Sequence, residues 1–400
     1  MSKIKPPELE QELGMNVYTS KTEGIGGVVK QTPEDFVVEE ITPEGRILQI
    51  DEEAVECSRE GEEEKEYVHF TLQKYNWDTL RAVREISRRL RVSHKRLGFA
   101  GTKDKRALTT QRVSVWNKKI MDLEGVGIRD MVLRDFRYSD ERINLGDLYG
   151  NRFTVVIRGL DLGEVILRER VSSVMDELRN QIPAFFGVQR FGTVRPITHL
   201  VGKEIIKGDF REAVLIYLVR DFMGEDEGVR EVRKALGESG DFRGALRDFP
   251  KHLGYENAML NHLVNAPEDY TGALRKLPKG LQQMFVHAYQ GYIFNKALSE
   301  YLKRGIPVER LPLVGYRTEV DEITSGILDE EGIIQEDFQV SMRELSSKGE
   351  YRVCFRVVED FEVIGFDVDE LNTGRSKLTV GFTLQKGNYA TVFLRELMKT

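Results

Sequence analysis

Cysteine is scarce in this sequence. Cys57 and Cys354 are the two cysteines among 400 residues, they lie far apart, and neither belongs to a Cys-x-x-Cys pair. A disulfide-stabilised scaffold and a zinc cluster are therefore not expected. The six histidines are scattered and have no neighbouring group of cysteines or carboxylates. The sequence therefore predicts no metal site.

Long apolar runs and nucleotide-binding motifs are also missing. Without a stretch of about 18 apolar residues, no membrane-spanning helix is expected. The N-terminal segment lacks the apolar core of a secretory signal, so we expect a cytoplasmic protein. No P-loop, His-Glu-x-x-His or Gly-x-Ser-x-Gly motif occurs, and "GIGG" at 24–27 lacks the rest of a dinucleotide fingerprint. The sequence therefore shows none of these nucleotide-binding, metalloprotease or hydrolase motifs.

The composition is that of a folded protein. Hydrophobic residues make up 40% of the sequence and charged residues 31%, which is typical of soluble globular chains. A length of 400 residues exceeds one ordinary core, so we expect two domains.

Charge is distributed unevenly along the chain. The net charge is −7, yet residues 81–112 contain eleven Lys or Arg and two acidic residues. Residues 51–66 contain nine acidic residues and two basic ones, and we expect them to form a hairpin loop or a solvent-facing extension. The basic stretch is either a solvated helix face or a surface that attracts phosphates, because the local field decides docking.

Hydrophobic periodicity predicts strands at both ends of the chain. Strands are expected at 30–41, 66–77, 109–116, 149–160, 350–364 and 377–389, and helices at 78–92, 161–181, 209–222, 281–304 and 389–397. Asp78 and Asn388 are the candidate N-caps of two of these helices. Strands at both ends with helices between them predict one sheet that is built from the two terminal parts and interrupted by an inserted domain.

One acidic residue lies in the most basic part of the chain. In "GFAGTKDKRALTTQ" (98–111), Asp104 lies among Lys103, Lys105 and Arg106, with Arg112 just beyond. It is either a turn residue held by salt bridges or a reactive carboxylate that the cations keep charged. Aromatic residues near the expected strand ends, with this carboxylate and a basic rim, fit an enzyme that extrudes and stacks an RNA base.

The segment "FAGTKDKRALTTQ" resembles the catalytic signature of the TruD family of pseudouridine synthases, which isomerise the uridine at position 13 in the D-arm of tRNA. The segments "KQTPEDFVVEE", "GNRFTVVIRGL", "PAFFGVQRFG", "YQGYIFNKALSEYL" and "GNYATVFLRELMK" also resemble family segments, in the family's order. The resemblance covers most of the chain, although residues 200–275 carry little of it.

The resemblance implies an α+β fold. It is a pseudouridine synthase catalytic domain, with a mainly antiparallel sheet and flanking helices, into which the family's TRUD domain is inserted. The expected domains are 1–183 for the first part of the catalytic domain, 184–352 for the inserted TRUD domain, and 353–400 for the second part of the catalytic domain.

The resemblance also assigns roles to single residues. Asp104 takes the place of the catalytic aspartate, either as a nucleophile or as a general base. The cation beside it is expected to be Lys30 or Arg190. The residues that fall on substrate-binding positions are Lys30, Phe36, Asn151, Phe153 and Tyr389. Those expected to contact the RNA backbone are Arg84, Arg88, Lys103 and Lys105.

The implied function is that of a tRNA pseudouridine synthase without cofactor or metal, whose partner is tRNA and which needs no partner protein. Two alternatives remain open at this point. One is a non-catalytic RNA-binding or RNA-folding protein that has kept the synthase cleft. The other is an RNA hydrolase or glycosylase that uses a carboxylate. The residues alone also leave core packing open for Phe153 and a turn role open for Asn151.

Overall fold

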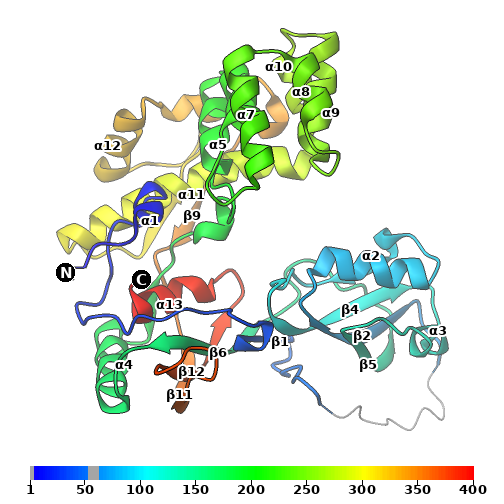
Figure 1. Cartoon of the computed structure of the whole chain (residues 1–400), viewed down its shortest axis with the longest axis vertical. Coiled ribbons are helices and arrows are strands. Elements are labelled where there is room, and N and C mark those ends of the chain that lie inside the picture. The colour runs from blue at the N-terminus through cyan, green and yellow to red at the C-terminus, as the bar shows by residue number, and fades with distance from the viewer. Residues whose placement is uncertain (1–3, 53–62) are drawn as a thin grey trace. The chain divides into compact units, whose positions relative to one another are not determined.

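The computed structural model describes residues 4–52 and 63–400, and the chain forms two compact units (Figure 1). The sheet unit consists of Thr22–Ile182 and Val357–Thr400. The helical unit consists of the chain up to Lys21 and of Pro183–Arg356. The acidic stretch 51–66, expected to be a loop or an extension, lies mostly outside the described residues.

The first 21 residues differ from the expected domain division. The sequence predicts that they belong to the first part of the catalytic domain, whereas in the structure they belong to the helical unit. The Asn295 side chain explains this, because it donates to the Leu13 carbonyl and to the Phe186 carbonyl from inside that unit. Ser299 adds a second link by donating to the Gly14 carbonyl.

A twisted eight-stranded sheet dominates the described part of the sheet unit. Its order is β11-β12-β6-β1-β4-β2-β5, with β3 paired to β4 off this path, and every pair is antiparallel except β1 with β4. The strands are β1 (Phe36–Ile41), β2 (Tyr67–Tyr75), β3 (Leu97–Phe99), β4 (Leu108–Trp116), β5 (Met131–Ser139), β6 (Gly150–Leu160), β11 (Glu359–Val368) and β12 (Ser376–Gln385).

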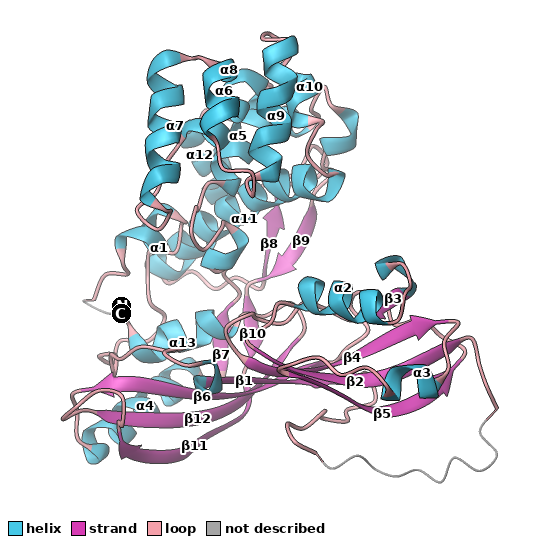
Figure 2. Cartoon of the chain, turned by 45° about the vertical axis from the view of Figure 1, so that its right-hand side comes forward, coloured by secondary structure: helices cyan, strands magenta, loops and turns pink. Residues whose placement is uncertain are grey.

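Helices cover this sheet, and Figure 2 shows α2 along the β2–β4 half and α13 along the β6–β12 half. Apolar side chains of β2 at every second position are buried against one face of α2, which includes Val83 and Ile86. The helices of this unit are α2 (Thr79–Arg89), α3 (Ile120–Glu124), α4 (Glu164–Leu178) and α13 (Ala390–Met398), with short 3-10 turns at Pro33–Asp35 and His94–Arg96.

The helical unit is organised around one long buried helix, α11 (Lys279–Arg304). It packs along α5, and Gly202 allows the close approach because a Cβ there would collide with the Phe285 carbonyl. The other elements are α1 (Glu8–Glu12), α5 (Thr198–Lys207), α6 (Phe210–Val219), α7 (Glu227–Ser239), α8 (Phe242–Asp248), α9 (Gly254–Asn265), α10 (Tyr270–Leu274), α12 (Glu322–Glu331), the strand pair β8 (Arg310–Leu313) and β9 (Glu350–Val353), and 3-10 turns at Val188–Arg190, Gln335–Phe338 and Arg343–Leu345. Two further short strands, β7 (Gln181–Pro183) and β10 (Phe355–Val357), pair where the chain passes between the units.

The predicted α+β class with a mainly antiparallel sheet is confirmed, and several local predictions are corrected. In the helices expected at 78–92 and 161–181, the apolar residues Leu80 and Val165 lie on exposed faces, half or more exposed. The N-cap of α13 is Tyr389 instead of Asn388, whereas Asp78 caps α2 as expected by accepting from the Arg81 amide. The strand expected at 350–364 is split into β9, β10 and β11, because β9 pairs within the helical unit and β11 within the sheet unit.

No helix in the described part of the chain is long and apolar enough to cross a membrane.

Candidate active site

The parallel pairing of β1 and β4 brings two loops to one edge of the sheet. Val37 pairs with Leu108 in this parallel pair, so the segments that precede the two strands lie at the same end of the sheet. Lys30 lies in the segment before β1, and Asp104 lies in the segment before β4. Residues that are 74 positions apart in sequence therefore face each other.

Asp104 pairs with Lys30. The Lys30 Nζ lies 3.3 Å from Asp104 Oδ1, and the Asp104 side chain is 51% exposed, so this carboxylate is both paired and reachable. The same ammonium lies 3.9 Å from the centre of the Phe36 ring, a cation–π contact. Lys30 has a φ of +61°, which is uncommon for a residue with a side chain. Such backbone conformations persist where the surrounding structure enforces them, and they cluster at functional sites.

Of the two cations expected beside Asp104, the structure places Lys30 there. Arg190 belongs to the helical unit, where its guanidinium lies over the Phe186 ring with 5.6 Å between group and ring centre.

A buried lysine holds the Asp104 loop from below. Lys74, fully buried on β2, donates to the Asp104 carbonyl at 2.8 Å and to the Trp77 carbonyl at 2.5 Å. Burial lowers the pKa of Lys74 to about 8, against the opposing attraction of Asp104. The Lys103 amide adds another anchor by donating to Thr79 Oγ1 at the start of α2. The main chain at Asp104 is therefore fixed while its carboxylate faces outward.

The predicted contact of Lys103 with phosphates is corrected by the structure. Its ammonium is buried and lies 2.5 Å from Glu40 Oε2. Glu40 also accepts from the Arg112 amide, so both carboxylate oxygens are occupied. Lys103 is thus a structural ion pair under the loop, whereas Lys105 is exposed and free of this constraint. The alternating sequence of basic residues gave no sign of which lysine points inward.

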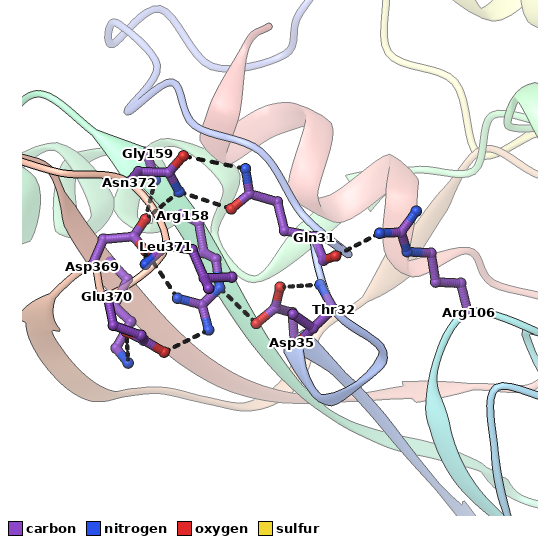
Figure 3. A network of polar contacts seen from close by, with 11 residues as sticks. Gln31, Thr32, Asp35, Arg106, Arg158, Gly159, Asp369, Glu370, Leu371 and Asn372 are labelled. Carbon is purple, nitrogen blue, oxygen red and sulfur yellow. Dashed lines mark hydrogen bonds and ion pairs between the residues drawn. The ribbon is translucent and has the colours of Figure 1, made fainter.

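The Asp104 and Lys30 loops are tied together by a polar network (Figure 3). Arg106 donates to the Gln31 carbonyl, which links the residue after Lys30 to the residue two after Asp104. The Gln31 side chain accepts from Asn372 at 2.8 Å, and Asn372 donates to Asp369 at 2.7 Å. The C-terminal part of the sheet unit therefore positions the Lys30 loop.

Arg158 is the centre of this network. Its guanidinium contacts Asp35 at 2.7 Å, Asp369 at 2.9 Å and Glu370 at 3.0 Å, and its side chain is 7% exposed. Burial alone would raise the pKa of Asp369, but bonds from Asn372, two backbone amides and Arg158 hold it far below its usual range. The Asp35 carboxylate also accepts from the Thr32 amide. The segment between Lys30 and Phe36 is thus fixed at several points.

Aromatic rings continue from Lys30 across the sheet face. Phe36 meets Phe153 edge-on at 6.0 Å, Phe153 stacks on Phe382 at 5.1 Å, and Phe382 meets Phe393 of α13 at 4.6 Å. All four rings are buried, with Phe153 6% exposed and Phe36 1%. The predicted substrate residues Phe36 and Phe153 are therefore neighbours, and a continuous row of contacts leads from α13 through these rings and Lys30 to Asp104.

Asn151 lies on the same face as these rings. It pairs in register with Glu40, and the period of two along β6 puts its side chain on the side of Phe153. Its buried Oδ1 has no hydrogen-bond partner among the described residues. A buried polar atom without a partner is uncommon and points to a ligand or water that completes it.

Tyr389 is the predicted substrate residue that these contacts do not reach. It is partly buried at the N-cap of α13, and within the described ranges no side-chain hydrogen bond or ring contact joins it to the other predicted site residues. It shares α13 with Phe393, which is the last ring of the row.

The basic helix α2 presents exposed guanidinium groups. Arg88 is 75% exposed and paired with Glu85 at 2.8 Å, whereas Arg84 is exposed with no ion-pair partner in the described part of the chain. Arg81 lies over the Trp77 ring, with its Cζ 4.6 Å from the ring centre. The helix therefore offers at least one uncompensated cation to an anionic partner.

Several positioning residues escaped prediction, and two of them left a signal. Lys74 and Arg158 are charged residues within otherwise apolar strand patterns, and such residues are buried only when they are paired or hydrogen-bonded. Gln31 and Asn372 gave no signal, because their contact joins residues that are 341 positions apart.

No group of three or more His, Cys, Asp or Glu residues that would hold a metal ion is found in residues 4–52 and 63–400. Asp104 and Lys30 form a pair of one carboxylate and one ammonium beside the Phe36 ring, and Asn151, whose Oδ1 has no partner among the described residues, lies on the sheet face that carries this ring. This set suits proton transfer or nucleophilic attack on a planar ring system.

Comparison with known proteins extends the likeness to the whole chain. The family model described as "tRNA pseudouridine synthase D (TruD)" matches residues 12–312 and 309–397. Curated proteins named "Probable tRNA pseudouridine synthase D" from Methanosarcina mazei and Methanococcoides burtonii are 38% and 37% identical to this chain. These two matches cover 99% and 98% of this chain, respectively, and 98% of each relative. A crystal structure of a Methanosarcina mazei protein described as tRNA pseudouridine synthase D (TruD) superposes with a TM-score of 0.80 at 38% identity, covering 99% of this chain and 98% of that one. The chain belongs to the TruD family of pseudouridine synthases.

Proposed function

We propose that this protein is the tRNA pseudouridine synthase that isomerises the uridine at position 13 in the D-arm of tRNA, and that it does so in the cytoplasm. The observation that carries the proposal is the exposed Asp104 carboxylate, paired with Lys30 beside the Phe36 ring, in a chain of the TruD family. The sheet unit is then the catalytic domain and the helical unit is the TRUD domain.

The proposed reaction exchanges one bond to the ribose for another. The N1–C1′ bond of the uridine breaks, the uracil turns, and a C5–C1′ bond forms. The proton on C5 leaves to solvent and N1 takes up a proton, so the product has the same composition as the substrate. No electrons and no phosphoryl group are transferred.

Asp104 acts on the nucleoside in one of two ways. As a nucleophile at the sugar, it displaces N1 from C1′ and is displaced in turn by C5; as a nucleophile at the base, it adds to the ring and is eliminated after the C5–C1′ bond has formed. As a general base, it removes the proton from C2′ while the N1–C1′ bond breaks, and it returns that proton to C2′ when C5 bonds to C1′. Both routes begin from the carboxylate form of Asp104, and Lys30 Nζ lies 3.3 Å from one of its oxygens.

Substrate recognition is assigned to the residues around this pair. The free Oδ1 of Asn151 accepts a hydrogen bond from the extruded nucleotide. Phe36 and Phe153 are assigned the aromatic contacts with the nucleotide, and Tyr389, the N-cap of α13, is assigned a further contact with it. The RNA backbone is bound by three exposed residues, Arg84, Arg88 and Lys105. Their contribution to affinity, and its salt dependence, grow with the number of phosphates that they neutralise.

One assay tests this proposal. An unmodified tRNA transcript labelled with tritium at uracil C5 is incubated with the full chain, and released tritium and nucleoside products are measured. Tritium release with pseudouridine at position 13 and intact RNA is expected. Binding without tritium release would support an RNA-binding protein that has kept the cleft, and free uracil or cleaved RNA would support a glycosylase or hydrolase. Either result would overturn the proposal.

A further inference from the structure

A second hollow surface lies wholly within the helical unit. A cavity of about 710 Å³ is lined by residues of α11, β9, the Val188–Arg190 turn and the 343–350 segment. A neighbouring cavity of about 600 Å³ shares Tyr316, Arg343 and Ser346 with it, so the two form one elongated depression. We call this the helical-unit groove, and its charged and aromatic lining residues are Phe186, Arg190, Tyr316, Arg343, Lys348 and Arg352.

The groove is basic although the chain is acidic overall. Four Lys or Arg residues line it against one carboxylate, Glu350, while the whole chain has a net charge of −7. Local excess of one sign in a concave surface concentrates the field and attracts ions of the other sign. The groove therefore favours an anionic occupant.

Two of the groove cations have no ion-pair partner among the described residues. Arg343 and Lys348 are exposed, and no ion pair of either is found in the described part of the chain. The Nε of Arg190 is buried without a hydrogen-bond partner among the described residues. Burial lowers the pKa of His287 on the groove wall, and the positive charge of Arg190 lowers it further. This imidazole is therefore neutral at pH 7, and it contributes hydrogen-bonding atoms instead of charge.

The groove also has aromatic walls and a fixed shape. The Phe186 ring lies under Arg352 at 4.3 Å, and Tyr316 is partly exposed on the stretch common to both cavities. Gln290 fixes one wall by donating to the Val314 carbonyl and to Ser347 Oγ. Gly349 has a φ of +79° and no room for a Cβ, because the main chain there packs closely against Leu313, Gly315 and Thr318. The groove is thus preformed.

We propose that the helical-unit groove binds a looped or unpaired segment of the tRNA substrate, at least two nucleotides long, outside the nucleotide that is isomerised. Exposed cations bind consecutive phosphates, and Tyr316 stacks on a base, which is the combination that holds single-stranded nucleic acid. An elongated basic depression with an aromatic wall fits a polynucleotide better than one small anion, because a single phosphate would contact only some of the cations along the groove. The inference rests on the proposed function for the identity of the RNA.

The test uses charge reversal at the two exposed cations, Arg343→Glu with Lys348→Glu, in the full chain. The matched control is Arg247→Glu with Lys251→Glu, which makes the same change of charge on exposed residues of the same unit that do not line the groove. Binding of the unmodified tRNA transcript is measured at several salt concentrations. The groove variant is expected to bind at least about tenfold more weakly than the control, with a salt slope smaller by about one to two, because each phosphate contact on a single strand contributes roughly 0.7 to that slope.

A second measurement locates the RNA directly. With Tyr316 replaced by p-benzoylphenylalanine, irradiation is expected to crosslink the tRNA at nucleotides other than position 13. Equal affinity and equal salt slope of the groove and control variants would overturn the proposal. So would a groove variant that loses affinity for inorganic phosphate or an acidic peptide but retains tRNA affinity.

These results are separate from those that test the proposed function. The groove is judged by tRNA affinity and its salt dependence, whereas the proposed function is judged by pseudouridine formation in the wild-type protein. If the wild-type protein forms no pseudouridine but the groove variant still loses tRNA affinity, the proposed function is refuted and the proposal that the groove binds tRNA is supported.

Discussion

The candidate active site and the helical-unit groove use cations in opposite ways. In the active site, Lys30, Lys103 and Arg158 each face a carboxylate at 2.5–3.3 Å. In the groove, four Lys or Arg residues and one carboxylate, Glu350, line the surface, and Arg343 and Lys348 have no ion-pair partner among the described residues. Paired cations fix a geometry, whereas unpaired cations remain available to a polyanion.

This difference follows from what each region has to do. A carboxylate that reacts with one atom of a nucleoside must be held within a fraction of an ångström, and buried ion pairs with hydrogen bonds supply that restraint. Binding a flexible phosphate backbone needs net positive charge instead, since the free energy comes from counterion release. The comparison predicts that variants of the first region change rate or stability, and variants of the second change affinity.

The strongest test is Asp104→Asn. The amide can neither attack the nucleoside nor accept its proton, so turnover is expected to fall by at least about a thousandfold. The tRNA dissociation constant should change by less than about threefold, because the side chain is one exposed group in a large interface. Tritium release and filter binding measure the two quantities. Residual activity with a large loss of binding would contradict the assigned role and remove the contrast with the groove.

The next effect is expected from Arg158→Ala. It leaves Asp35 and Asp369 buried without their partner, which should lower the free energy of unfolding by about 3–5 kcal/mol. The matched control is Arg168→Ala, since Arg168 pairs with Glu164 on an exposed helix face and such pairs contribute about 0.3–0.5 kcal/mol. Chemical denaturation measures both. Equal losses would show that the network around Arg158 has no special role in holding the Lys30 loop.

Lys74 is a third kind of cation to compare with these two, because it is buried and its hydrogen bonds go to carbonyl groups. Its folded pKa of about 8 lies below the unfolded value of about 10.4, so between these pH values the unfolded chain binds more protons than the folded one. Stability from this group therefore rises as pH increases from 8 towards 10.4, by roughly 1–3 kcal/mol in all. Lys74→Met should lack this rise. Denaturation of both proteins at pH 7, 8.5 and 10 tests it, and parallel pH profiles would refute it.

The smallest effect is expected on α2, where a paired and an unpaired arginine lie one turn apart. Arg84→Ala should weaken tRNA binding about threefold to fivefold and reduce the salt slope by about one. Arg88→Ala should do less, because Glu85 already neutralises part of its charge. Salt titrations of tRNA binding compare the two variants. An unchanged slope in both would exclude α2 from the RNA interface.

The sequence predicted most of the helices and strands, and it singled out Asp104, which the structure places half-exposed beside Lys30. The periodicities around 66–77 and 149–160 gave β2 and β6, because alternation of apolar residues reports a half-buried strand directly. The Asp104 segment stood out since one acid in a basic loop is chemically unusual. Its roles, and those of Lys30, Phe36, Asn151, Phe153 and Tyr389, stay predictions until the variants are measured.

What the sequence did not predict was pairing over long distances. Nothing in the sequence tells that Lys103 turns inward to Glu40 while Lys105 faces solvent, because both lie in the same basic stretch. The contacts of Arg158 with Asp369 and of Phe153 with Phe382 join residues more than 200 positions apart. Such contacts depend on strand order, and the parallel pair of β1 and β4 that creates the site has no local signature.

The split of the sheet unit along the chain has a consequence for synthesis on the ribosome. The partners Asp369, Phe382 and Phe393 all lie after the helical unit in sequence, so they emerge last. A nascent chain that has already made Asp104 and Lys30 still lacks the strand and helix that lock their surroundings. The candidate active site therefore cannot be completed until the C-terminal part of the chain has been synthesised. A chain terminated before β12 lacks Phe382 and Phe393, and so lacks the last two rings of the aromatic row.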